Sequence, residues 1–139
     1  MPVETPQLPD DPIHLGRVQH VTLCVTDEAE SRAFYTQVLG LAEANRPPLR
    51  MPGLWLQVGA TQIHLMVPPD SAELPRPRAL DRTPIAPHLA FEVPALEPMV
   101  SNLRARGIAV ILSEFVEGQA FLTDPSGNIL ELNAPLPDG

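Results

Sequence analysis

The sequence contains little cysteine and few basic residues. Cys24 is the only cysteine among the 139 residues, which excludes an intramolecular disulfide framework and a zinc site of the CxxC type. The chain has nine Lys and Arg residues against seventeen Asp and Glu residues, a formal net charge of −8. Binding to a nucleic-acid backbone needs clustered positive charge, so we expect no nucleic-acid partner.

Long apolar runs are also missing. No stretch approaches the ~18 apolar residues of a transmembrane helix. The N-terminal stretch MPVETPQLPDDPIHLG has neither the basic start nor the apolar centre of a signal peptide. We therefore expect a cytoplasmic protein with no membrane partner. The length is sufficient for one domain with a real core, or for two small modules that share one.

Proline, by contrast, is abundant, and ten of the eighteen prolines lie in two stretches. The first is residues 1–15, which we interpret as a flexible N-terminal arm. The second is 68–87, with the sequence PPDSAELPRPRALDRTPIAP. Proline lacks a backbone donor and disfavours helix in the residue before it, so this stretch is typical of an extended connector. The remainder predicts a single domain over 16–135, with module one at 16–67 and module two at 88–135.

Both modules show the same order of predicted elements. Strands are indicated by alternating or β-branched apolar runs. The first helix is indicated by a capping residue at its start, the second by Pro94, which suits a first turn, and both by a glycine at the end. In module one this predicts strands at 17–25, 41–44, 54–59 and 61–67, with a helix in 26–40. In module two it predicts strands at 87–93, 108–112, 119–124 and 128–133, with a helix in 94–107. The order is β-α-β-β-β in each.

Equivalent positions of the two modules repeat at a nearly constant offset. His20 and His88 are 68 residues apart (88 − 20), Gly40 and Gly107 are 67 apart, and His64 and Glu131 are also 67 apart. Such a period indicates a duplicated supersecondary unit. Each module then carries one residue of the metal-ligand type on its first strand and one on its last.

His20, His64, His88 and Glu131 are therefore the candidate metal ligands. Three imidazoles and one carboxylate suit a divalent ion such as Fe, Mn, Ni, Co or Zn. His14 has no counterpart in module two, and we take it as solvated.

The motifs QHVTLCVTD and FYTQVLGL in module one, with HLAFEV and FLTDPSGNILELN in module two, resemble the vicinal oxygen chelate superfamily over about residues 16–135. This superfamily includes glyoxalase I, methylmalonyl-CoA epimerase, fosfomycin-resistance enzymes, extradiol dioxygenases and bleomycin-resistance proteins. The resemblance implies an α+β fold in which two βαβββ modules form a cupped mixed sheet around a metal. It also implies that His20, His88 and Glu131 are ligands. His64 matches the variable fourth position, which serves as a ligand or as an acid–base group.

Three functions remain open at this point. The first is a divalent-metal-dependent lyase or isomerase that chelates a small substrate through vicinal oxygens and moves a proton next to a carbonyl, with Glu131 and His64 as catalytic residues. The second is an extradiol-type Fe(II) dioxygenase. In such enzymes a tyrosine precedes the ligand glutamate by ten residues, whereas Phe121 occupies that place here and cannot hydrogen-bond a catecholate. The third is a non-catalytic ligand-binding or resistance protein.

The resemblance also implies a homodimer with one divalent metal ion per site. Two assemblies are compatible with the chain. All four residues face one metal within a chain, or His20 and His64 of one chain face His88 and Glu131 of its partner. We favour the second.

Overall fold

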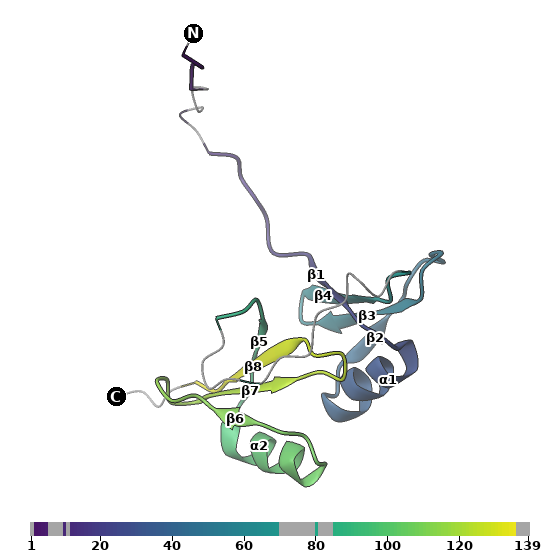
Figure 1. Ribbon diagram of the computed structural model, residues 1–139, viewed down its shortest axis with the longest axis vertical. Helices are drawn as coiled ribbons and strands as arrows, with labels where there is room; N and C mark the ends of the chain where they lie inside the picture. Colours follow the sequence, from purple (N-terminus) through teal and green to yellow (C-terminus); the bar gives the residue numbers. More distant parts are fainter. Residues whose placement is uncertain (1, 6–9, 11, 70–79, 81–84, 136–139) are drawn as a thin grey trace.

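The computed structural model describes residues 2–5, 10, 12–69, 80 and 85–135. Two modules of the same element order follow one another along the chain (Figure 1). Module one contains β1 (His20–Cys24), α1 (Glu28–Arg32), the π-helix η1 (Ala33–Val38), β2 (Ala42–Ala44), β3 (Gly53–Val58) and β4 (Thr61–Met66). Module two contains β5 (Leu89–Glu92), α2 (Leu96–Ala105), β6 (Ile111–Leu112), β7 (Gln119–Thr123) and β8 (Ile129–Asn133). The predicted β-α-β-β-β order is confirmed twice.

Each module builds its own four-stranded mixed sheet. The strand orders are β1-β4-β3-β2 and β5-β8-β7-β6. The first and last strands of each module are parallel neighbours, and the other pairs are antiparallel. The α+β fold of two such modules is confirmed, although the eight strands in the described part of the chain form two sheets rather than one. β1 and β5 each lie at the edge of their sheet.

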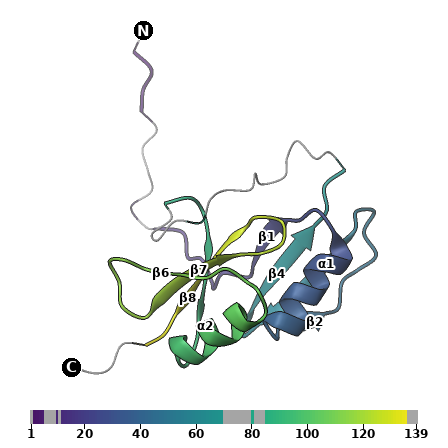
Figure 2. The same cartoon turned by 60° about the horizontal axis from the view of Figure 1, so that its bottom comes forward.

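Alternation along the strands separates a core face from an open face. Leu54 and Leu56 of β3 are buried together with Ile63 and Leu65 of β4, because successive side chains of a strand point to opposite faces. Each helix lies beside the strands of its own module (Figure 2). The residues between the core positions, including His64, therefore lie on the opposite face of the sheet.

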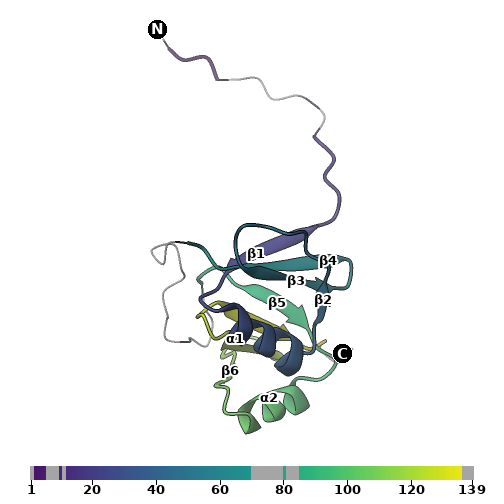
Figure 3. The same ribbon diagram turned by 90° about the vertical axis from the view of Figure 1, so that its right-hand side faces the viewer.

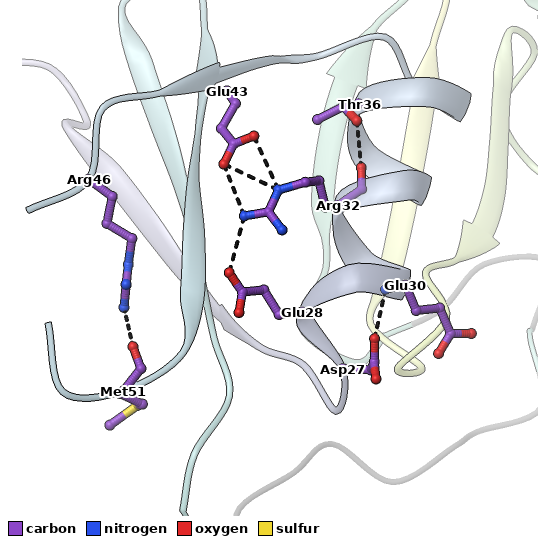
Figure 4. Close-up of polar contacts among 8 residues, drawn as sticks. All are labelled: Asp27, Glu28, Glu30, Arg32, Thr36, Glu43, Arg46 and Met51. Atoms are coloured by element: carbon purple, nitrogen blue, oxygen red, sulfur yellow. Dashed lines mark hydrogen bonds and ion pairs between the residues drawn. The ribbon is translucent and has the colours of Figure 1, made fainter. Parts of the chain in front are cut away.

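The helical segment of module one differs in detail from the expected single helix. Asp27 caps its start, since the carboxylate accepts a hydrogen bond from the backbone N–H of Glu30 at 2.7 Å. Arg32 forms ion pairs with both Glu28 and Glu43, which link α1 to β2 (Figure 4). From Ala33 onward the backbone widens into a π-helix, where Leu39 donates to the carbonyl of Phe34, five residues earlier.

A buried polar cluster joins the two modules of one chain. The Tyr35 hydroxyl donates to Asp124 Oδ2 at 2.7 Å. Asp124 Oδ1 also accepts the backbone N–H groups of Ser126 and Asn128, both at 2.9 Å. Asn128 Nδ2 donates to the Cys24 carbonyl at 2.9 Å. Burial, and then the negative charge of Asp124, raise the pKa of Tyr35 far above its ordinary value. The turn between β7 and β8 is thereby fixed against β1 and η1, and we call this cluster the module latch.

Some predicted boundaries shift. The first strand begins at His20 rather than Arg17, and the strand predicted at 108–112 is reduced to Ile111–Leu112. The described residues of the N-terminal arm and the residues that follow it up to β1 are exposed and lead away from the folded body (Figure 3). Most of the predicted connector, namely 70–79 and 81–84, lies outside the described residues. No helix in the described part of the chain has the length and apolarity needed to cross a membrane.

Candidate metal centre

In module two, His88 and Glu131 form a close pair. His88 immediately precedes β5, and Glu131 lies in the middle of β8, the parallel neighbour of β5. His88 Nε2 lies 3.1 Å from Glu131 Oε1. The Glu131 side chain is 10% exposed and that of His88 is 26% exposed. A carboxylate this well buried requires a cation or several donors to offset its lost hydration.

The hydrogen bonds around this pair resemble those of metal ligands. His88 Nδ1 lies 2.7 Å from the Ala86 carbonyl oxygen, which only accepts, so the proton is on Nδ1. In the neutral ring Nε2 then carries a lone pair that faces a carboxylate oxygen, and only a proton or a metal cation between them makes that contact favourable. Asn133 Nδ2 donates to Glu131 Oε2 at 2.6 Å. Outer hydrogen bonds of this kind orient histidine and carboxylate ligands.

In module one, His20 and His64 lie on neighbouring strands and share the open face. Thr22 is the register partner of His64 in the β1–β4 pair, so His20, two residues before Thr22, points to the same side. The two imidazoles stack with centroids 4.0 Å apart and planes inclined by 15°. Trp55, opposite His64 on β3, stacks on the second face of the imidazole at 4.0 Å and 3°. His64 is consequently only 9% exposed.

Each of the two rings has a glutamine side-chain oxygen within hydrogen-bond distance, and the pKa of His64 is shifted. His20 Nδ1 lies 2.7 Å from Gln19 Oε1, and His64 Nε2 lies 2.9 Å from Gln62 Oε1. The pKa of His64 is lowered from its ordinary value of 6.5, first by burial and then by the positive charges of His20 and Arg46. His64 is therefore a neutral imidazole near pH 7.

The structure brings the four predicted ligands together as two pairs. Within the described part of the chain, no three side chains among His, Cys, Asp and Glu cluster closely enough to hold one metal ion. We call His20 with His64 the histidine half-site, and His88 with Glu131 the carboxylate half-site. The histidine half-site includes the edge strand β1, and His88 immediately precedes the edge strand β5.

Several residues of the site were not predicted from the sequence. Gln62 lies two residues before His64, and Asn133 lies two residues after Glu131, so the two-residue period of a strand places each beside its partner. This two-residue spacing is visible in the sequence and could have identified both residues as neighbours of the candidate ligands. Trp55 stacks on the His64 ring. Phe121 is 1% exposed and packs edge-on against His88, with centroids 6.1 Å apart.

The remaining histidine and the cysteine have different surroundings. His14 is exposed in the arm. Cys24 is half-buried, and it is the register partner of Met66 in the β1–β4 pair, on the same face as His20.

Comparison with known proteins relates this geometry to a family. Residues 17–132 match the model of the Glyoxalase/Bleomycin resistance protein/Dioxygenase superfamily. Glyoxylase I 4 of Arabidopsis thaliana is 30% identical over 128 residues, which cover 88% of this chain and 72% of the plant protein. A glyoxalase family protein of Bacillus anthracis superimposes with a TM-score of 0.75 at 26% identity, covering 91% of this chain and all of the other. The fosfomycin resistance protein FosX of Listeria monocytogenes shares the fold, with a TM-score of 0.71 at 18% identity over 88% of this chain and 95% of its own.

Proposed function

Because the chain belongs to the Glyoxalase/Bleomycin resistance protein/Dioxygenase superfamily, we propose that it is a divalent-metal-dependent enzyme of the lyase or isomerase type. Its substrate is a small molecule that offers two vicinal oxygens, and the reaction moves a proton next to a carbonyl. The observation that carries this proposal is the carboxylate half-site, in which His88 Nε2 lies 3.1 Å from Glu131 Oε1. Two related proteins support it. The Arabidopsis relative bears the name of a glyoxylase, and the FosX structure is a complex with Mn(II) and a dihydroxypropylphosphonic acid.

The residues present fit a divalent ion. His88 would bind through Nε2, because Nδ1 is held by the Ala86 carbonyl, and Glu131 would bind through Oε1, because Oε2 accepts from Asn133. His20 would supply the third donor and complete a two-histidine, one-carboxylate set suited to Fe, Ni, Zn, Mn or Co. The bound ion supplies Lewis acidity for the substrate oxygens and stabilises the negative charge that develops there.

His64 is the acid–base group in this proposal. It lies beside His20 on the open face, it is neutral near pH 7, and a neutral imidazole accepts a proton and returns it within one turnover. Glu131 is the second candidate, since a ligand carboxylate that loosens from the metal also accepts a proton. Phe121 lacks the hydroxyl group that a catecholate needs, so the lyase or isomerase reaction is favoured over ring cleavage.

The complete site is proposed to form between two chains. Within the described residues of one chain, no three of the candidate ligands lie close enough to hold one metal ion, and the module latch links the two modules by hydrogen bonds. β1 and β5 also remain edge strands, and exposed edges favour association. A homodimer in which the histidine half-site of one chain faces the carboxylate half-site of its partner gives two complete sites.

Metal analysis of the purified protein tests the proposal. We expect about one divalent ion per chain in the wild type, and a steep loss of metal affinity in His20→Ala, His88→Ala and Glu131→Ala, because each removes a ligand. His14→Ala is the matched control and should retain the metal. Stoichiometric metal in all three ligand variants would sink the site assignment. Bound iron with oxygen consumption on catechols would point to a dioxygenase, and a wild type without metal would point to a ligand-binding protein.

A further inference from the structure

Three side chains and one backbone carbonyl form a continuous line of hydrogen bonds along the β3–β4 hairpin. Gln57 Nε2 donates to the Gly59 carbonyl at 2.8 Å. Gln62 Nε2 donates to Gln57 Oε1 at 2.9 Å. Gln62 Oε1 lies 2.9 Å from His64 Nε2. We call Gln57 and Gln62 the glutamine relay.

The Gly59 carbonyl at one end determines which group donates and which accepts in every hydrogen bond of the series. A carbonyl oxygen only accepts, so Gln57 must turn its NH₂ group toward Gly59 and its oxygen toward Gln62. Gln62 must then offer its NH₂ group to Gln57 and its oxygen to His64. Two acceptors cannot share a hydrogen bond, so His64 Nε2 carries a proton. The lone pair of the neutral ring is therefore on Nδ1.

The stacking geometry also limits what His64 can bind. A metal lies close to the plane of an imidazole, about 2.1 Å from its nitrogen. His20 and His64 lie in nearly parallel planes with centroids 4.0 Å apart. A metal ion in the plane of one ring would lie out of the plane of the other, so one ion cannot bind both imidazoles. With Trp55 on the other face, only the edge of the His64 ring is open to a ligand.

We infer that Gln62 and Gln57 are positioning residues that hold His64 with its proton on Nε2 and reserve Nδ1 for proton transfer instead of metal binding. This inference rests on the proposed function and assigns the role of the fourth residue in it. The substrate C–H bond next to the carbonyl breaks, its electron pair stays on the substrate, and the proton forms a bond with Nδ1. The Nε2 proton stays hydrogen-bonded to Gln62, and Nδ1 returns its proton to the product.

Nitrogen-15 NMR of the histidine rings in the metal-free protein tests the relay without any need for turnover. We expect His64 as the Nε2–H tautomer in the wild type. In Gln62→Met the ring proton loses its acceptor, and its exchange with solvent should accelerate roughly two- to tenfold, the effect of one hydrogen bond. Gln37→Met, an exposed substitution on η1, is the matched control and should leave exchange unchanged. A wild-type Nδ1–H tautomer, or equal exchange in both variants, would overturn the inference.

Addition of Zn(II) then separates this inference from the proposed function. We expect the ring nitrogens of His20 and His88 to shift on binding, while those of His64 keep the pattern of a free imidazole. Gln62→Met should keep the wild-type zinc affinity. Direct zinc coordination by His64, or a loss of affinity in Gln62→Met as large as in Glu131→Ala, would overturn the inference. If zinc shifts no histidine at all, the proposed function fails, whereas the tautomer of His64 still tests the relay.

Discussion

His64 combines burial, stacking on both faces and a directed hydrogen bond in one side chain. Its pKa is lowered below 6.5, chiefly by burial. The unfolded chain therefore takes up the proton more readily than the folded chain. The contribution of His64 to the free energy of unfolding is complete above pH 6.5, declines as the pH falls below 6.5, and is lost below the pKa of the folded state.

Removal of the Trp55 indole ring should raise the pKa of His64 toward its ordinary value. In metal-free Trp55→Ala, water reaches one face of the imidazole, so we expect the pKa of His64 to rise toward 6.5 and the associated pH dependence of stability to weaken. Proton NMR titration of His64 and urea unfolding between pH 5 and 7.5 measure the two effects. Phe115→Ala removes an aromatic ring that is 78% exposed and should change neither. An unaltered His64 titration in Trp55→Ala would show that burial is not the cause.

The β3–β4 hairpin depends on a glycine where the two strands approach closely. A Cβ atom at Gly53 would lie 2.2 Å from the Leu65 carbonyl oxygen and 3.3 Å from a guanidinium nitrogen of Arg46. Because the first neighbour is backbone, Gly53→Ala must displace a strand. We expect it to lower the free energy of unfolding by about 1–3 kcal/mol, as overpacking does.

Urea unfolding of two glycine variants measures this effect. Gly16→Ala adds the same methyl group where no atom lies within 4 Å, so its stability should stay within about 0.5 kcal/mol of the wild type. Equal stabilities for the Gly53 and Gly16 variants would contradict the close approach.

Local sequence patterns predicted the order of strands and helices well. They predicted the exact ends of these elements and the packing of the two modules less well. Alternating apolar residues located all eight strands, and the offset between modules identified His20, His64, His88 and Glu131 as related positions. The π-helix at Ala33–Val38 was missed because so short a widened segment does not change the spacing of apolar residues enough to distinguish it from an α-helix. The short β6 was overestimated because apolar residues before it meet no partner strand. The separation into half-sites depends on how the modules pack, and a repeat period carries no information on packing.

The proposed pairing of half-sites between chains can be tested by mixing two variants. His20→Ala damages the histidine half-site, and Glu131→Ala damages the carboxylate half-site, so each homodimer lacks both complete sites. In a mixed dimer with cross-chain sites, one site carries both defects and the other carries none. After random subunit exchange half of the dimers are mixed, so metal binding should recover to about one quarter of the wild-type capacity.

A matched pair of variants controls for incidental recovery. His88→Ala and Glu131→Ala damage the same half-site, so mixing these two should restore nothing in either assembly. Native mass spectrometry verifies the dimer and the exchange of subunits, and bound metal is measured on the same samples. Confirmed exchange without recovery in the first mixture would rule out sites shared between chains.

Trp55 is the only tryptophan of the chain, and it is the ring that stacks on His64. The intrinsic indole emission of this protein therefore originates from a single position on the open face of module one. A protonated imidazole in contact with an indole quenches its fluorescence, and a molecule that parts the two rings changes the environment of the excited state. The protein thus carries its own optical reporter of the charge on His64 and of occupancy beside it, readable at micromolar concentration without a label.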